Sequence, residues 1–366
     1  MNKQFSIYLD LLRFVAAGFV FLSHVTMFAG GWLWQLAAFG HEAVVFFFVL
    51  SGFVIAYVVY EREEKAFKYT VNRLSRIYSV TIPALLLTII LYYGGHAISP
   101  EAFQDLDKRL LDPVWTLFSG LFFINQSWVG TPMLSNLPYW SLGYEVLYYC
   151  FFGVFVFTKG WLRLLLLLGV VGVMGPSILL YLPIWLTGVW CFRNLNRFQL
   201  SLRRSVLLYV VSIFGIFVFV REDVQNIVNL YAKDLLGESV YGWLLEPADK
   251  FAADYLLAVF VTLHLYAGYH VISQKYHFSE WWEKVIRYFS AHTFSLYLYH
   301  MPMLYFVSAV VPYDSNPILN IVSCWLLIPL SILLLSTYTE NKKASYQTFF
   351  SRGLGRLRKA EKYPAA

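Results

Sequence analysis

The chain has 366 residues, of which 59% are hydrophobic and only 14% are charged, and its mean hydropathy is +0.58. A soluble domain does not have this composition, and several stretches approach the ~20 apolar residues that a helix needs to cross a bilayer. A transmembrane barrel would show short segments of alternating hydrophobicity, and the sequence has none. The composition therefore predicts an all-α, polytopic membrane protein.

The formal net charge of +6 is interpreted as a sign of membrane topology, and no nucleic-acid partner is expected. Cys150, Cys191 and Cys324 lie in apolar segments without the spacing of disulfides or metal ligands. We therefore expect no metal and no permanently bound cofactor. The N-terminal segment lacks the small-residue cleavage site of a secretory signal, so it is expected to be a true span.

The hydrophobic pattern predicts ten spanning helices. All but five of the 28 Lys and Arg then fall on the side of the N-terminus, and this positive-inside bias predicts that both termini lie in the cytoplasm. We expect one transmembrane domain over residues 1–340 and a basic tail over 341–366 that lies along the anionic inner leaflet. The predicted spans are 8–28, 41–60, 79–97, 139–158, 161–177, 178–192, 205–220, 251–271, 290–311 and 317–338.

Two long outer connections are predicted, residues 98–138 and 221–250. The first contains the apolar piece VWTLFSGLFFI, residues 114–124. This piece is too short to cross the hydrocarbon comfortably, so it is expected to be either re-entrant or interfacial. Neither connection has the length or the patterning of a separate soluble domain.

The first span carries ionisable side chains among apolar ones. Asp10, Arg13 and His24 recur at helical spacing in YLDLLRFVAAGFVFLSHVTMFA, so they share one face, with Arg13 and His24 about 16 Å apart along the axis. Ionisable groups in a span usually face a protein interior or a watery cavity. Two ordinary explanations stay open: Arg13 can extend to the headgroups, and a lone intramembrane histidine is often a packing residue.

A second charged motif, VNRLSRIYSV, follows the second predicted span on the inner side. It places Arg73 and Arg76 one helical turn apart. Two arginines at a membrane surface commonly contact lipid phosphates. The alternative is recognition of a diffusible phosphorylated ligand, because guanidinium groups donate forked, bidentate hydrogen bonds.

The fourth predicted span begins PYWSLGYEVLYY and carries Glu145 in an aromatic run. A buried carboxylate needs a partner or must be protonated, and we expect His24 rather than Arg13 to be its neighbour. Glu42 lies near the outer interface, where we expect it to be hydrated, and Ser51 belongs to a small-residue pair that allows close helix packing. The further polar residues expected to line a site are Asp10, Trp140, Tyr144, Ser295, Tyr299 and His300.

In their order along the chain, these pieces resemble the acyltransferase 3 family of integral-membrane acyltransferases. The combination of Arg and His eleven residues apart, then LSGF, then RxxR is specific for this family. The SGF and WSL pieces taken singly are weak indicators of it. Ser79 stands where the family commonly has a proline after RIY. This departure affects the expected local backbone conformation more than the expected chemistry. We expect the stand-alone form, without a fused hydrolase-like domain. The matching pieces are LDLLRFVAAGFVFLSH (9–24), FFFVLSGF (46–53), RLSRIY (73–78), WSLGYE (140–145) and SLYLYH (295–300).

The resemblance implies an acetyl-CoA-dependent O-acetyltransferase of a bacterial inner membrane. Such an enzyme moves an acyl group, usually acetyl, from cytosolic acyl-CoA as co-substrate to a hydroxyl of a surface or exported polysaccharide or glycolipid. The expected partners are acyl-CoA, a glycan or lipid-linked glycan acceptor, and membrane lipid. His24 is implied to be catalytic, and we group Glu145 with it, while Arg13, Arg73 and Arg76 are expected to bind the donor. We rank direct transfer with His24 as general base above a covalent acyl-histidine.

The alternative is a transporter or flippase in which Arg13, His24, Glu42 and Glu145 line a proton or substrate path. Transporters often contain inverted repeats with broken helices, and no such duplication is visible in the sequence. A structural scaffold would leave the intramembrane charges unexplained. Release of free CoA thiol from acetyl-CoA in the presence of acceptor distinguishes the acyltransferase from both.

Overall fold

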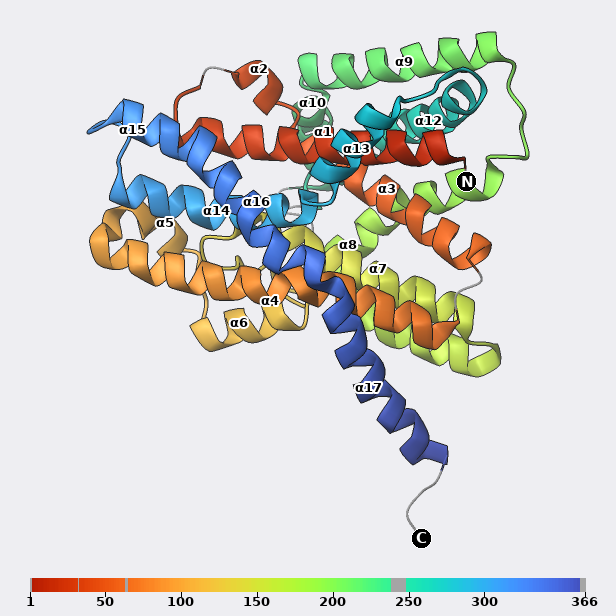
Figure 1. Ribbon diagram of the computed structural model, residues 1–366, viewed down its shortest axis with the longest axis horizontal. Helices are drawn as coiled ribbons and strands as arrows, with labels where there is room; N and C mark the ends of the chain where they lie inside the picture. The colour runs from red at the N-terminus through yellow and green to blue at the C-terminus, as the bar shows by residue number, and fades with distance from the viewer. Residues whose placement is uncertain (1, 32, 63–64, 238–247, 363–366) are drawn as a thin grey trace.

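The structure is a computed structural model of the chain that describes residues 2–31, 33–62, 65–237 and 248–362. In these residues the fold is helical and contains no β-strand, which confirms the predicted fold class. The long helices run side by side, and α5 (Gln104–Asp107) and α15 (Pro317–Val322) lie at the end of the bundle opposite the N-terminus (Figure 1).

Eight stretches of the described residues are long and apolar enough to cross a membrane. Seven of them contain one main helix each: α1 (Lys3–Phe28), α3 (Gly40–Glu61), α4 (Ala66–Ile98), α7 (Trp140–Phe157), α8 (Gly160–Asn194), α9 (Leu202–Arg221) and α12 (Phe251–Lys275). The eighth runs from Pro317 to Gly355 and contains α15, η5 (Ser323–Leu327), α16 (Ile328–Tyr338), η6 (Glu340–Lys342) and the start of α17 (Lys343–Lys362). The shorter elements between these are α2 (Trp34–Ala37), η1 (Pro100–Phe103), η2 (Leu137–Tyr139), α10 (Val224–Leu236) and α13 (Glu280–Ser290).

The predicted spans 161–177 and 178–192 correspond to the two arms of α8, which share one label but are separated by a kink at Gly175, close to the predicted boundary. The backbone there has φ +72° and ψ 174°, a conformation that glycine adopts without steric cost. A Cβ atom at Gly175 would lie only 1.8 Å from the carbonyl oxygen of Ser127, so glycine is also required by the close approach of the chain. The bend lets the two arms of α8 pack as separate helices.

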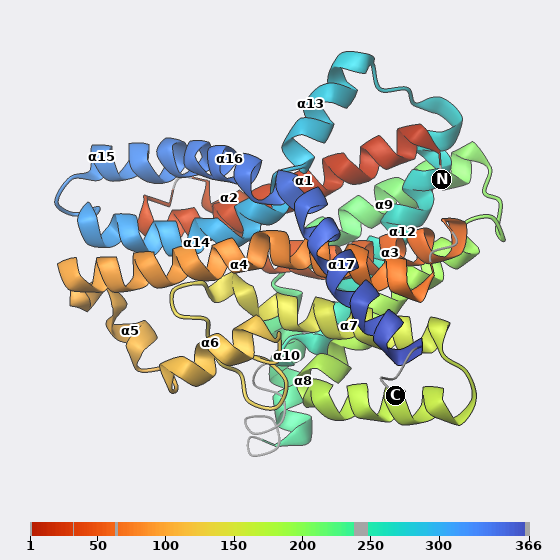
Figure 2. The same ribbon diagram turned by 60° about the horizontal axis from the view of Figure 1, so that its bottom comes forward.

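The predicted span 290–311 corresponds to α14 (Thr293–Val310), which is not among the eight stretches. Its tyrosine, serine, threonine and histidine side chains lower its mean hydropathy, although it lies inside the bundle between α16 and α4 (Figure 2). The number of spans and the cytoplasmic location of the termini stay predictions.

The apolar piece 114–124 does not cross the bundle. It forms α6 (Pro113–Leu121), a nine-residue helix that Asp112 caps by accepting a hydrogen bond of 2.8 Å from the backbone N–H of Trp115. Val114 and Phe118 are exposed, whereas Thr116 is buried. A short helix with one apolar face turned outward is typical of an interfacial segment.

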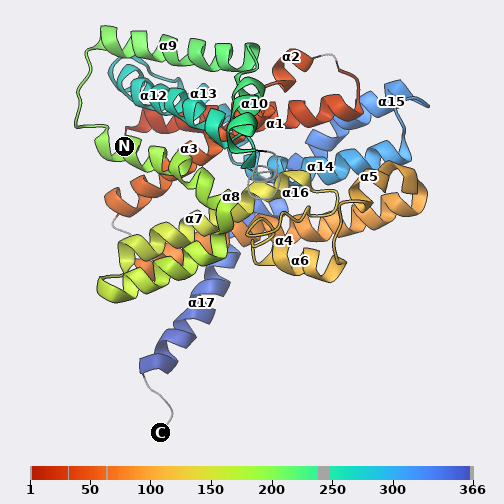
Figure 3. The same ribbon diagram turned by 180° about the vertical axis from the view of Figure 1, so that it is seen from behind.

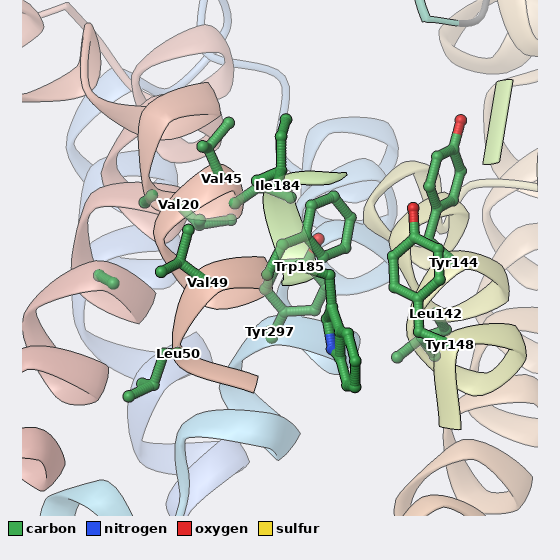
Figure 4. Close-up of a cluster of buried hydrophobic side chains, with 14 of the residues drawn as sticks. Val20, Val45, Val49, Leu50, Leu142, Tyr144, Tyr148, Ile184, Trp185 and Tyr297 are labelled. Carbon is green, nitrogen blue, oxygen red and sulfur yellow. The ribbon is translucent and has the colours of Figure 1, made fainter. Parts of the chain in front are cut away.

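Close packing of α3 on α8 builds the centre of the bundle. A Cβ at Gly52 would lie 2.0 Å from the carbonyl oxygen of Trp185, so the small residue permits this approach, as the sequence predicts. Figure 4 shows Val49 of α3 beside Trp185 of α8 and Tyr297 of α14, with Tyr144 of α7 on the other side. Trp185 and Tyr144 are completely buried, and such large rings contribute much of the packing energy.

The tail beyond the last span is a helix that begins by packing on the bundle. Nε2 of Gln347 in α17 donates to Oδ1 of Asn72 in α4 at 3.1 Å, and the rings of Phe350 and Tyr78 have centroids 5.8 Å apart. The last part of α17 extends beyond the other helices (Figure 3). The predicted domain boundary after residue 340 falls within η6, and contact of the tail with a lipid leaflet stays a prediction.

Candidate active site

A cavity of about 80 Å³ lies among α1, α3, α4, α7 and α14. Its charged lining residues are Arg13, Arg73, Arg76 and Glu145, so three of the sequence motifs meet at one place. The remaining lining consists of aliphatic, aromatic and hydroxyl side chains, Ser51 among them. Three guanidinium groups and one carboxylate line the cavity, and Asp10 pairs with Arg13 from outside the lining. Arg73 and Arg76 against Glu145 still leave an excess of positive charge, which suits an anionic ligand.

The arginine pair lies on the first turns of α4, on the side that faces α7. The guanidinium of Arg73 lies 5.8 Å from the ring centroids of both Tyr69 and Tyr149. Its Nε atom is buried without a hydrogen-bond partner, which costs roughly 1–3 kcal/mol. In the described part of the chain, neither Arg73 nor Arg76 forms an ion pair with a carboxylate. Because Arg73 is only 9% exposed, this geometry favours a ligand in the cavity over lipid phosphates.

Glu145 belongs to a hydrogen-bond network at the wall of the cavity. It accepts a hydrogen bond from Oγ of Ser51 at 3.1 Å and another from the hydroxyl of Tyr149. Nε1 of Trp185 donates to Oγ of Ser51 at 3.2 Å, so three helices hold this group of side chains in place.

The expectation that His24 rather than Arg13 neighbours Glu145 is wrong, because Glu145 and Arg13 line the same cavity and His24 does not. The physical reason is the connection before α7, which enters the bundle. Asn136 in this connection is fully buried, and its Nδ2 donates to the carbonyl oxygen of Leu298 at 2.9 Å. The helix that carries Glu145 therefore begins inside the bundle.

Arg13 is held by hydrogen bonds rather than extended toward headgroups. Its Nη1 donates to Oδ1 of Asp10 at 2.9 Å. Asp10 also accepts from Nη1 of Arg287 at 2.8 Å and from Oγ of Ser290 at 3.2 Å, both in α13. Asp10 is thus not a cavity residue, and it connects Arg13 to the amphipathic helix α13.

His24 pairs with a second histidine that the sequence places 276 residues later. Nδ1 of His24 lies 2.8 Å from Nε2 of His300, and the two rings stack with centroids 5.0 Å apart. Nδ1 of His300 donates to the carbonyl oxygen of Leu296 at 2.7 Å. His300 is completely buried, whereas His24 is half-buried.

The histidine pair lies just beyond the cavity. Tyr297 lines the cavity, and His300 follows it on α14 after three residues, a rise of about 4.5 Å. The ring of Tyr297 meets that of Phe47 edge to face at 6.0 Å, and its hydroxyl lies 2.7 Å from Oγ of Ser141. These side chains form the end of the cavity nearest His300.

Several predicted site residues have other positions. Glu42 is 7% exposed with Oε2 lacking a partner, so its expected hydration is wrong: packing of α1 and α12 around the start of α3 covers it. It lines a separate apolar groove that includes Phe19 of α1. Trp140 and Tyr144 pack against Phe48, with ring centroids 6.2 and 5.8 Å away.

Ser295 and Tyr299 hold the end of the last span instead of lining the cavity. The backbone N–H and Oγ of Ser295 donate to Oε2 of Glu340 at 3.0 and 2.9 Å, and the hydroxyl of Tyr299 donates to Oγ1 of Thr339 at 2.9 Å. Glu340 thereby accepts from a free N–H at the start of α14. Glu340 and Tyr149 are not among the site residues predicted from the sequence. The four-residue spacing between Glu145 and Tyr149 could have indicated Tyr149.

The fold and the cavity together define a multi-pass membrane protein with an internal, positively charged site. Comparison with protein-family models identifies its class: the acyltransferase domain Acyl_transf_3 matches residues 6–336. The chain therefore belongs to the acyltransferase 3 family and is a membrane acyltransferase. Comparisons with curated proteins and with solved structures gave no match.

Proposed function

We propose that this protein is an O-acyltransferase of a bacterial inner membrane. It transfers an acyl group, acetyl in the simplest case, from cytosolic acyl-CoA to a hydroxyl of a surface or exported polysaccharide or glycolipid. The observation that carries the choice of donor is the cavity with Arg13, Arg73 and Arg76 around a single carboxylate. CoA carries several phosphate groups, and arginine binds phosphate through paired hydrogen bonds.

One end of the site binds the donor, and the other end carries out the acyl transfer. Arg73 and Arg76 bind donor phosphates at the end of the cavity predicted to face the cytoplasm. Glu145, grouped with His24 on sequence, acts at this donor end, where it orients Ser51 and Tyr149 and offsets part of the arginine charge. The acyl thioester reaches past Tyr297 toward His24, whose helix spacing from Arg13 is about 16 Å.

His24 acts as the general base. It accepts the proton of the acceptor hydroxyl as the hydroxyl oxygen bonds to the thioester carbonyl carbon. The tetrahedral intermediate then collapses, the carbon–sulfur bond breaks, and the leaving thiolate takes up the proton to give free CoA thiol and an ester. A positioned general base typically accelerates such a step by about 10²–10⁴-fold.

The test uses purified protein in lipid nanodiscs with acetyl-CoA or succinyl-CoA and with glycan or lipid-linked glycan acceptors. Acceptor-dependent release of CoA thiol, together with an acyl ester on the acceptor detected by mass spectrometry, is the expected result. His24→Ala is expected to lose most transfer and to keep donor binding. Absence of thiol release with every donor and acceptor pair, from protein that binds no CoA, would overturn the choice of donor.

A further inference from the structure

We infer that His300 is a positioning residue that holds the proton of His24 on Nδ1, so that Nε2 of His24 is the nitrogen that receives the acceptor's proton. The inference rests on the proposed function and adds a second histidine to its chemistry. It follows from two consecutive contacts, one between Nδ1 of His24 and Nε2 of His300 and one between Nδ1 of His300 and the backbone carbonyl of Leu296, because the second contact sets the direction of the first.

The backbone carbonyl fixes the first proton. The oxygen of Leu296 can only accept, so Nδ1 of His300 must carry hydrogen in the contact of 2.7 Å. A neutral imidazole has one N–H, so Nε2 of His300 is then an acceptor. His300 is kept neutral because it is 0% exposed and, among the described residues, forms no ion pair with a carboxylate.

The proton on Nδ1 of His300 determines where the proton of His24 lies. Nε2 of His300 lies 2.8 Å from Nδ1 of His24, and an acceptor at that position requires His24 to donate. Nδ1 of His24 is therefore protonated, and its Nε2 keeps the lone pair that a general base needs. The transfer step is balanced with this assignment: the acceptor's proton binds Nε2 of His24 and later passes to the CoA thiolate.

Packing holds the pair in this arrangement. The two imidazole rings stack at an interplanar angle of 26°, and Phe21 meets His300 edge to face with centroids 6.0 Å apart. The fully buried His300 is the fixed member of the pair, and the half-buried His24 is the member that we assign to meet the acceptor. In metal sites, outer partners that orient a histidine typically account for about 10- to 100-fold in activity, and we expect an effect of the same order here.

The test compares two substitutions that differ in the hydrogen bond they can offer. His300→Asn can still donate near the position of Nδ1, but it has no atom where Nε2 was. His300→Gln places an amide oxygen near the Nε2 position, where it can accept from His24. We expect His300→Asn to lower kcat by about 10- to 100-fold with unchanged acetyl-CoA affinity, and His300→Gln to recover much of the rate.

His24→Ala, measured in the same preparations, separates this inference from the proposed function. If His24→Ala is inactive and His300→Asn keeps the wild-type rate, the positioning role is wrong and the base assignment stands. If His24→Ala itself transfers at the wild-type rate, the base assignment is wrong. Equal losses in the Asn and Gln variants with normal donor binding would show that His300 is only a packing residue.

Nitrogen-15 NMR of histidine-labelled wild-type protein tests the same point without a His300 variant. The His24 signal is assigned by its loss in His24→Gln. A protonated Nδ1 and an unprotonated Nε2 at His24 are expected, and the reverse pattern would overturn the inference. This measurement applies equally if a His300 variant does not fold.

Discussion

Arg13 donates a hydrogen bond of 2.9 Å from Nη1 to Oδ1 of Asp10, three residues earlier on the same helix. The other oxygen of Asp10 accepts from Arg287 of α13 at 2.8 Å. The guanidinium of Arg13 is thus fixed at the edge of the cavity by a carboxylate that does not itself line it. A ligand phosphate would meet a preoriented arginine, which lowers the entropic cost of binding.

The first prediction concerns this carboxylate. Asp10→Asn is expected to raise the KM for acetyl-CoA about fivefold with little change in kcat, because a partly exposed ion pair contributes about 1 kcal/mol to the orientation of Arg13. Titration of CoA binding and initial rates measure both quantities. Arg287→Ala is the matched control, since it removes the charged one of the two contacts between Asp10 and α13 and leaves the Arg13–Asp10 contact. An unchanged KM in Asp10→Asn would show that Arg13 needs no orienting partner.

The second prediction concerns the arginine pair of α4. Arg73→Ala and Arg76→Ala are each expected to weaken acetyl-CoA binding by about 10- to 100-fold, because a charge-assisted hydrogen bond contributes about 1.5–3 kcal/mol. The wild-type affinity is expected to fall with added salt more steeply than that of the variants. Isothermal titration in nanodiscs measures the affinities.

Arg62→Ala is the control for this experiment, because Arg62 is exposed at the end of α3 and does not line the cavity. Normal CoA affinity in the two α4 variants, with activity that merely follows protein abundance, would identify the pair as lipid anchors.

The third prediction concerns the carboxylate of the cavity. Glu145→Gln keeps an oxygen that accepts from Ser51 and Tyr149 but removes the negative charge. We expect CoA to bind about three- to tenfold more tightly, because the arginines lose their competing anion, and kcat to fall as product release slows. Product-inhibition kinetics report both effects.

Glu42→Gln serves as the control, because Glu42 is also buried but lines a different groove. Wild-type CoA affinity and turnover in Glu145→Gln would show that the charge of Glu145 has no role at the donor end.

The fourth prediction concerns orientation in the membrane. Single cysteines at Ser345 in α17 and at Gln104 in α5, both exposed positions, are introduced into a variant in which the exposed Cys150 is replaced by alanine. An impermeant thiol reagent applied to intact cells is expected to label position 104 and to spare position 345. Labelling of both positions would contradict an arrangement with the C-terminus in the cytoplasm.

The membrane class and the helix faces shared by the residues of each motif could be predicted from the sequence, because both depend on local properties. A run of apolar residues is long enough to cross hydrocarbon whatever surrounds it. Helical periodicity places Asp10 and Arg13 on one face, and the same periodicity sets Arg73 one turn from Arg76. The contact between Arg13 and Asp10 and the shared cavity of the arginines agree with these local rules.

The meeting of separate helices was decided only by the tertiary structure. Periodicity specifies which side chains share a face of one helix, but it does not specify the depth at which a helix begins or which neighbour it contacts. Burial of Asn136 starts α7 inside the bundle and brings Glu145 to the arginines. The close approach of Gly175 to the carbonyl oxygen of Ser127 fixes where α8 bends into its two arms. The pairing of His24 with His300 likewise depends on packing of α1 against α14, because hydrogen bonds between distant residues form only where the helices are held together.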